Sequence, residues 1–233
     1  NGENAADLGV GITKKNTEDF FNAGADVITT GNHVWDQKET MEFITSEKRL
    51  LRPQNLIKGS PGKGFDIFNS KNNKKIAVIN LMGNIFMKKC DDVFEAAKKF
   101  IENVKLKKDA DFIVVDMHGE ITSEKMAMGY LFDGKVTMFV GTHTHVPTSD
   151  YRIMEKGTAY QTDIGMCGDY NSVIGMNRDN SLKKFFKDPS ATKHYPALGE
   201  ATISGLMVIA DDETGLAKKV EPIILGKSLE NRI

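Results

Sequence analysis

The sequence lacks the features that mark a membrane, secreted or nucleic-acid-coating protein. Lysine and arginine total 31 against 32 acidic residues, so the formal net charge is −1, whereas a nucleic-acid coat is normally clearly basic. No apolar run approaches the ~18 residues that a bilayer-spanning helix needs. The two cysteines, Cys90 and Cys167, are too few for a disulfide framework and fit a reducing compartment. We therefore expect a cytoplasmic protein with no membrane contact and no extended nucleic-acid surface.

Repeats, low-complexity tracts and linkers are also missing, which bears on the domain organisation. The 233 residues are enough for one compact domain with a full core. Hydrophobic residues make up 40% and charged residues 27% of the chain, a balance that is typical of a folded globular protein rather than a disordered one. The sequence predicts a single domain over residues 1–233.

The hydrophobic pattern changes character along the chain. Up to about residue 150, apolar runs that are typical of strands buried on both faces alternate with segments of helical spacing. Strands are predicted at 25–30, 75–81, 111–116 and 136–140, and helices at 16–24, 36–46, 91–105 and 124–130. Only strands are predicted beyond this point, at 151–154, 158–162, 202–210 and 219–225. The pattern predicts an α/β fold with two packed β-sheets flanked by helices.

Histidines gather where three of these strands end. The ends carry Gly31-Asn32-His33, His118-Gly119-Glu120 and Gly141-Thr142-His143-Thr144-His145, which together hold four of the five histidines. The carboxyl ends of strands in an α/β sheet share one crevice. Imidazole binds Mn, Fe and Zn, and carboxylates can bridge two such ions. Two cations ~3.5–4 Å apart can polarise a phosphoryl group and hold a hydroxide for in-line attack.

Each signal also has a plainer explanation. A His-x-His pair on a loop is more often a surface feature, Asn-His after a strand is often turn chemistry, and His118 alone could be a hydrogen-bonded histidine at the edge of the core. The coincidence at three strand ends favours one shared metal site. Three nearby carboxylates either orient the imidazoles or are ordinary strand-end residues, and the sequence leaves both open for Asp116, Glu120 and Asp163.

These blocks resemble those of the calcineurin-like metallophosphoesterases. The wider wording is similar to one branch, the YmdB-like phosphodiesterases, and the similarity runs in order along essentially the whole chain. It includes Asn1-Gly-Glu3-Asn4, Thr30-Gly-Asn32-His33-Val-Trp35-Asp36, Gly59-Ser-Pro61-Gly-Lys63-Gly64, Thr122-Ser-Glu-Lys125 and Thr162-Asp163-Ile-Gly165-Met166.

The resemblance implies a role for seven residues of this sequence. Glu3 takes the place of the carboxylate that bridges two metals, and His33 that of a proton donor that does not ligate them. Asn4 and His145 would bind the first metal, and the second would be bound by Asn32, His118 and His143. The resemblance further implies two ions, Fe and/or Mn, and hydrolysis of small phosphodiesters, 2′,3′-cyclic nucleotides above all, by metal-bridged hydroxide attack with a histidine general acid. It leaves a homo-oligomer open.

One part of the family pattern has no counterpart in the sequence. The family opens with a strand that ends in Gly-Asp and supplies a ligand to the first metal, and this strand would precede Asn1. The expected fold is therefore a calcineurin-like sandwich that is N-terminally incomplete. Two other functions stay open: a phosphomonoesterase or nucleotidase on the same core, and a non-catalytic metal- or nucleotide-binding regulator. The presence of Asn32-His33 argues against the regulator, which has no need of a proton donor.

Overall fold

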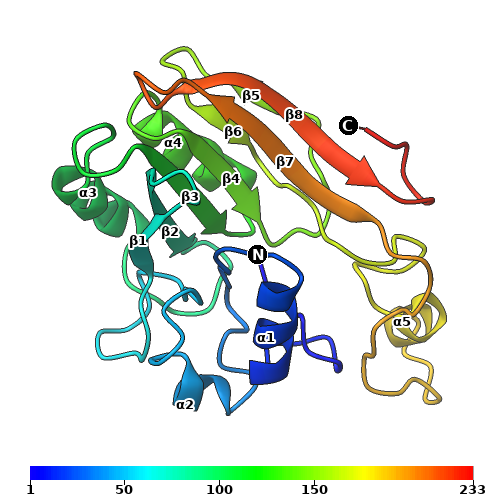
Figure 1. Cartoon of the computed structure of the whole chain (residues 1–233). Coiled ribbons are helices and arrows are strands. Elements are labelled where there is room, and N and C mark those ends of the chain that lie inside the picture. The colour runs from blue at the N-terminus through cyan, green and yellow to red at the C-terminus, as the bar shows by residue number, and fades with distance from the viewer. Residues whose placement is uncertain (233) are drawn as a thin grey trace.

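The computed structural model describes residues 1–232 and has a mixed sheet of six strands at its centre (Figure 1). The strand order is β1-β2-β3-β4-β6-β5. Neighbouring strands from β2 to β6 run parallel, whereas β1 and β5 pair antiparallel at the two edges. Their bounds are β1 Phe65–Asn69, β2 Lys75–Met82, β3 Phe112–His118, β4 Met138–Thr142, β5 Arg152–Ile153 and β6 Ala159–Gln161.

A second, antiparallel sheet consists of β7 (Ile203–Ala210) and β8 (Ala217–Leu225). This ribbon runs along the β5–β6 side of the main sheet, and β8 contacts both of those strands (Figure 1). The predicted α/β class and the presence of two sheets are therefore confirmed. The sheets are unequal, because the second has two strands where the first has six.

Five helices accompany the sheets. Helices α3 (Val93–Asn103) and α4 (Thr122–Phe132) connect successive parallel strands, and they contact β2 and β4 respectively. Helix α1 (Lys14–Asn22) and the single turn α2 (Thr40–Phe43) lie in the N-terminal segment, and α5 (Arg178–Phe185) precedes the ribbon. Within residues 1–232, none of the helices has the length and apolarity required to cross a bilayer.

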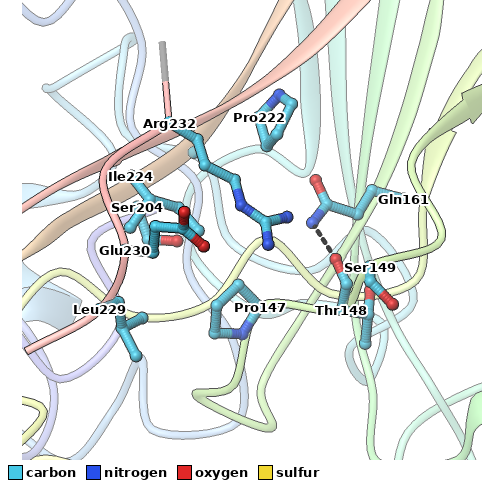
Figure 2. Close-up of a pocket in the computed structure, with 11 residues that line it drawn as sticks. Pro147, Thr148, Ser149, Gln161, Ser204, Pro222, Ile224, Leu229, Glu230 and Arg232 are labelled. Carbon is cyan, nitrogen blue, oxygen red and sulfur yellow. Dashed lines mark hydrogen bonds between the residues drawn. The ribbon is translucent and has the colours of Figure 1, made fainter.

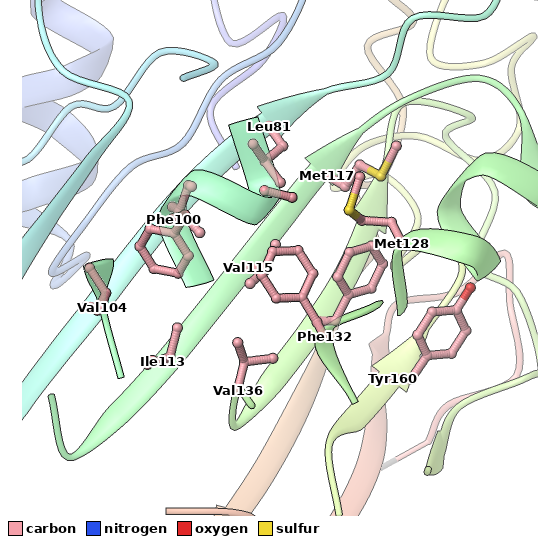
Figure 3. Packing of buried hydrophobic residues seen from close by; sticks show 14 of the residues in the cluster. Leu81, Phe100, Val104, Ile113, Val115, Met117, Met128, Phe132, Val136 and Tyr160 are labelled. Carbon is pink, nitrogen blue, oxygen red and sulfur yellow. The ribbon is translucent and has the colours of Figure 1, made fainter. Parts of the chain in front are cut away.

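The main core lies between the sheet and helices α3 and α4. Alternate residues of β2 and β3 point toward the helices and are fully buried, which explains why both strands read as apolar runs in the sequence. Phe100 of α3 and Phe132 of α4 pack edge-on with ring centroids 6.5 Å apart. Figure 3 shows how these rings fill the space above the strands, together with Leu81, Ile113, Val115, Met117 and Met128.

A smaller core holds the N-terminal segment together. It contains Ile12, Ile28, Val34, Ile44 and Leu50, and Trp35 packs against its edge. This segment is attached at Ile28, which forms an isolated parallel bridge with Leu50. The small core therefore supports the turn at residues 31–33, and Trp35 belongs to it.

Several predicted elements differ from those observed. Helix α1 is capped by Thr13 instead of Asn16, because the two side chains form a reciprocal capping box. The helix predicted at 36–46 shrinks to α2, since Thr40 Oγ1 donates to the carbonyl of Ile12 and ties the segment to a loop. The strand predicted at 25–30 is reduced to the Ile28 bridge. Two elements, β1 and α5, were not predicted.

Candidate metal centre

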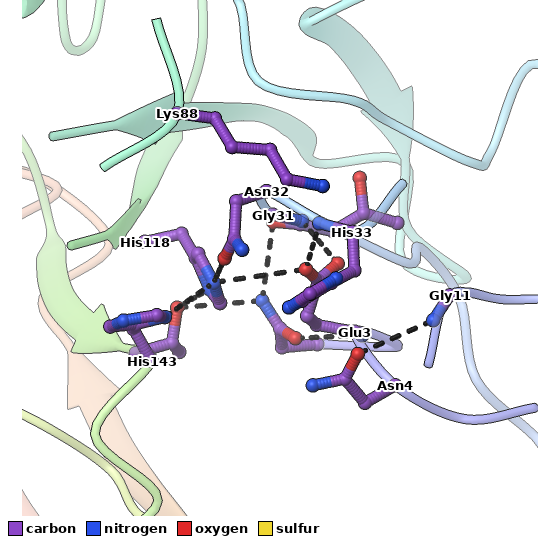
Figure 4. Close-up of polar contacts among 12 residues, drawn as sticks. Glu3, Asn4, Gly11, Gly31, Asn32, His33, Lys88, His118 and His143 are labelled. Carbon is purple, nitrogen blue, oxygen red and sulfur yellow. Dashed lines mark hydrogen bonds and ion pairs between the residues drawn. The ribbon is translucent and has the colours of Figure 1, made fainter. Parts of the chain in front are cut away.

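The predicted site lies at the carboxyl edge of the main sheet, where β3 ends at His118 and β4 ends at Thr142. Two further segments reach this edge from the N-terminal region. One is the turn 31–33, and the other is the start of the chain, where the backbone N–H of Gly2 donates to the carbonyl of Thr29 (2.8 Å). Figure 4 shows the side chains of these four segments pointing toward one another.

Three donor atoms surround Nε2 of His118. Oδ1 of Asn32 lies 2.8 Å away, Nδ1 of His143 lies 3.1 Å away, and Oε1 of Glu3 lies 3.8 Å away. The side chains of His118 and Glu3 are 3% and 5% exposed. Four nitrogen and oxygen donors from four separate segments thus converge on one small volume.

The spacing and chemistry of these donors fit a transition metal. Donors bound at ~2.1 Å with angles of about 90–110° lie roughly 3.0–3.4 Å apart, close to the separations around His118. Imidazole, amide oxygen and carboxylate suit Fe, Mn and Zn. Within residues 1–232 no three His, Cys, Asp or Glu side chains are already arranged around one metal position. The cluster includes an asparagine, and His143 turns its other nitrogen toward Glu120 (3.0 Å).

A chain of hydrogen bonds orients the ring of His118. Thr142 Oγ1 donates to Oδ1 of Asp116 (2.8 Å), so its lone pairs accept a hydrogen bond from Nδ1 of His118 (3.1 Å). The Nδ1–H tautomer leaves the lone pair of Nε2 directed at the cluster. Burial, assisted by the positive charge of neighbouring groups, lowers the pKa of His118 well below its usual value. The ring is therefore neutral, as a metal ligand must be.

Glu3 is held by the backbone of the turn that it faces. The N–H groups of Gly31 and His33 donate to its two carboxylate oxygens, at 2.7 and 2.5 Å. Residue 31 must be glycine, because a Cβ there would clash with the ring of His118. Burial raises the pKa of Glu3 to about 7, although hydrogen bonds from the turn oppose this rise. A cation in the cluster would favour the carboxylate form.

His33 stands at the rim of the cluster and has a separate set of partners. Its Nδ1 lies 2.5 Å from Oδ2 of Asp36, and Oδ1 of Asp36 lies 3.1 Å from Nζ of Lys88. Partial burial opposes ionisation of Asp36, but the hydrogen bonds from His33 and Lys88 outweigh it and lower the pKa of Asp36. The Asp36 carboxylate therefore stays ionised and can stabilise a protonated His33 ring.

The loop that carries His143 and His145 is fixed from below by a buried ion pair. Nζ of Lys125 lies 2.9 Å from Oδ2 of Asp163, and both side chains are almost fully buried. The same carboxylate oxygen accepts the backbone N–H of Thr144 (3.0 Å). His143 and His145 both adopt positive φ, 109° and 67°, a region that is costly for residues other than glycine. The ion pair helps to hold the loop in this conformation.

Comparison with known proteins places the chain in a family. The family model of YmdB-like proteins matches residues 1–223. The chain belongs to the YmdB-like family. It is 44% identical to the 2′,3′-cyclic-nucleotide 2′-phosphodiesterase of Bacillus subtilis strain 168, over 97% of this chain and 84% of that protein. The resemblance inferred from the motifs is confirmed.

Two solved structures are similar over most of the chain. A hypothetical protein from Thermus thermophilus has a TM-score of 0.85 and 34% identity, with 94% of this chain and 84% of that one covered. A protein from Mycoplasma pneumoniae that is described as a novel phosphatase has a TM-score of 0.83 and 36% identity, covering 94% and 78% of the two chains.

The structure assembles most, but not all, of the residues that the YmdB-like motifs single out. Glu3, Asn32, His118 and His143 form the cluster, and His33 adjoins it through its backbone. Asn4 instead accepts the N–H of Gly11 through Oδ1 (3.3 Å). The Nδ1 atom of His145 lies against the carbonyl of Ile174 (2.8 Å). Neither side chain has a hydrogen bond or ion pair with the cluster within residues 1–232.

The carboxylates that the sequence left open contact the site in three ways. Glu120 pairs directly with His143, Asp116 acts on His118 through Thr142, and Asp163 holds the backbone of the 143–145 loop. Sequence reasoning missed Lys88 and Lys125. Lys88 carries no local signal, whereas Lys125 follows Glu124 on a helix that begins only four residues after His118, and its burial gives it no surface pattern.

Proposed function

We propose that this chain is a phosphodiesterase that uses two metal ions, Fe and/or Mn, to hydrolyse small phosphodiesters, with 2′,3′-cyclic nucleotides as the preferred class. The observation that carries the proposal is the convergence of Glu3, Asn32 and His143 on Nε2 of His118, with His33 at the rim. The name of the Bacillus subtilis relative, a 2′,3′-cyclic-nucleotide 2′-phosphodiesterase, supports this substrate class.

The ligands divide between two positions. Asn32, His118 and His143 would hold one ion, and Asn4 and His145 would contribute to the other, with Glu3 between them. The short separations around His118 support the first set. For the second set the support is the resemblance, together with the free Nε2 atom that His145 keeps when Nδ1 contacts Ile174. When bound, the ions would polarise the phosphoryl group and activate the attacking water.

The residues of the chain supply the proton chemistry and the orientation. Water adds to phosphorus, one P–O bond breaks, and the departing ribose oxygen takes a proton from His33. The donor atom is Nε2, because Nδ1 is held by Asp36. The ionised Asp36 stabilises the imidazolium before transfer, and a general acid placed in this way contributes ~10²–10⁴ in rate.

The proposal extends to the whole chain. We propose that residues 1–233 form one calcineurin-like metallophosphoesterase domain, since the mixed sheet, the second sheet and the strand-end cluster fit that architecture. The absence of a membrane-spanning helix within residues 1–232 and the two free cysteines, Cys90 and Cys167, are compatible with a cytoplasmic enzyme. The residue set gives no reason to expect an extended nucleic-acid surface.

A substrate panel tests the function. The protein is loaded with Mn²⁺ or Fe²⁺ and assayed on 2′,3′-cyclic AMP and on adenosine monophosphates, with His194→Ala as the control because His194 is the one histidine outside the proposed site. We expect the cyclic diester to be hydrolysed at least tenfold faster than the monoesters. Faster release of inorganic phosphate from monoesters would favour the phosphatase alternative, which the description of the Mycoplasma pneumoniae structure supports. Metal binding without turnover would favour a regulator.

A further inference from the structure

A second cavity lies away from the metal centre, between the main sheet and the β7–β8 ribbon. Its volume is about 210 Å³. Its floor is the end of β6 and the loop that follows His145, and its roof is the ribbon with the segment 226–232 that folds back along β8. Pro147, Gln161, Ser204, Pro222 and Arg232 are among the residues that line it (Figure 2).

Gln161 presents an unpaired acceptor to this cavity. The side chain is 1% exposed, and its Nε2 donates to the carbonyl of Thr148 (2.8 Å). This bond fixes the orientation of the amide, so Oε1 faces away from Thr148. Within residues 1–232, Oε1 has no hydrogen-bond partner. A buried carbonyl without a partner is costly, and the cavity has room for about seven waters at ~30 Å³ each, or for a small ligand that donates to Oε1.

The returning segment adds one charge of each sign. Arg232 is anchored by its backbone, whose N–H and carbonyl both pair with Ile224 (2.8 Å each). Its guanidinium extends between Pro222 and Pro147, toward Gln161 (Figure 2). Glu230 also lines the cavity. Neither Arg232 nor Glu230 forms an ion pair with another charged side chain of residues 1–232.

We propose that this cavity binds a purine base. The site is separate from the metal centre, and the proposal does not rest on the proposed hydrolysis. The two opposite charges make a bare anion such as phosphate a poor ligand, because Glu230 would repel it. A neutral ring with both donors and acceptors on its edge satisfies all three polar groups at once.

A purine carries the required groups in the required number. Arginine pairs bidentately with the O6 and N7 atoms of guanine, whereas amide and carboxylate oxygens accept hydrogen bonds from amino groups of bases. Oε1 of Gln161 and the carboxylate of Glu230 would take the amino or imino hydrogens, and Arg232 would take the ring acceptors. The apolar faces of Pro147 and Pro222, on opposite sides of the guanidinium, suit the two faces of a flat ring (Figure 2).

Binding of nucleosides tests the proposal without involving the metal centre, since nucleosides contain no phosphate. Guanosine, adenosine and cytidine are titrated by calorimetry into the full chain and into Arg232→Met, Glu230→Gln and Gln161→Met. We expect a purine nucleoside to bind and its dissociation constant to rise at least tenfold in Arg232→Met and Glu230→Gln. Both residues lie in an exposed segment, so their variants remain informative even if Gln161→Met is destabilised.

Arg178→Met is the matched control, because Arg178 is an exposed arginine on α5 that pairs with Asp179 outside the cavity. It should bind the purine nucleoside like the unaltered chain. The proposal is overturned if no purine nucleoside binds at millimolar concentration, if cytidine binds as well as guanosine and adenosine, or if the cavity variants bind as tightly as Arg178→Met.

Discussion

The two halves of the proposed metal centre differ in how much of their geometry the fold supplies. Around His118, the donors of Glu3, Asn32 and His143 lie within 3.8 Å of Nε2 before any ion is bound. The other half, Asn4 and His145, has its side chains turned to the backbone of Gly11 and Ile174. The assembled half is built on a strand end and a buried hydrogen-bond chain, whereas the open half consists of loop residues with positive φ.

This contrast teaches that a strand end can fix a ligand at no further cost in ordering, because its neighbours in the sheet already hold it. His118 is the last residue of β3 and sits between β2 and β4. Asn4 and His145 depend on loops, so an ion must supply part of the energy that orders them. We therefore expect the half around His118 to bind metal more tightly than the other half.

The largest effect on turnover is expected from His33→Ala. The substitution removes the proton donor but none of the residues that we assign to metal binding, so both halves of the centre should keep their ions. Turnover of 2′,3′-cyclic AMP should fall by ~10²–10⁴-fold, with the metal content per chain unchanged. Steady-state kinetics and elemental analysis of the same sample measure both. Full activity in this variant would contradict the assignment of His33.

Asn32→Ala should weaken the assembled half directly. The change removes the oxygen 2.8 Å from Nε2 of His118 while leaving the backbone of the turn in place. Loss of a direct ligand should exceed the ~10–100-fold typical of outer partners, so we expect metal affinity at this half to fall at least 100-fold. A chelator competition measures it. An unchanged affinity would remove Asn32 from the ligand set.

Thr142→Val tests whether the hydrogen-bond chain beneath His118 matters. Valine has nearly the same shape as threonine but cannot link His118 to Asp116. Metal affinity at the assembled half should fall by ~10–100-fold, with the folded structure kept. Thr144→Val is the matched control, since the structure uses the backbone N–H of Thr144 rather than its hydroxyl. Equal affinities in the two variants would mean that the chain does not orient His118.

The smallest effect is expected from Lys88→Met. Lys88 supports Asp36 from the solvent side, where its side chain is 53% exposed, and exposed ion pairs contribute little. Turnover should fall about fivefold or less, and neither half should lose metal. The measurement is turnover together with metal content, compared with Lys89→Met next to it. A loss of metal in Lys88→Met would show that this lysine supports the ligands as well as the proton donor.

The sequence predicted the centre of the fold better than its edges. Strands β2 and β3 are buried on both faces, so their apolar runs were plain at 75–81 and 111–116. Strand β1 is an edge strand in which no residue is fully buried, and it gave no such signal. The helix predicted at 36–46 failed because side chains of that segment bond to loop carbonyls at Val10 and Ile12, which local propensity does not contain.

The site shows the same division. Residues in motifs that follow strands, such as His118 and Asn32, could be predicted because strand ends meet at one edge. The groups that support them could not be assigned, because their partners are remote in sequence. Thr142 and Asp116 are 26 residues apart, and Lys125 and Asp163 are 38 apart. Only the packed structure shows that these pairs hold the ligands.

A titration of the metal-free protein with Mn²⁺, repeated on His118→Gln and His145→Gln, tests the central claim most directly. The account predicts two binding events in the unaltered chain, one tight and one weak. His118→Gln should lose the tight event, whereas His145→Gln should lose only the weak one. Two unchanged events in His118→Gln would contradict the claim that Glu3, Asn32, His118 and His143 together form a metal centre.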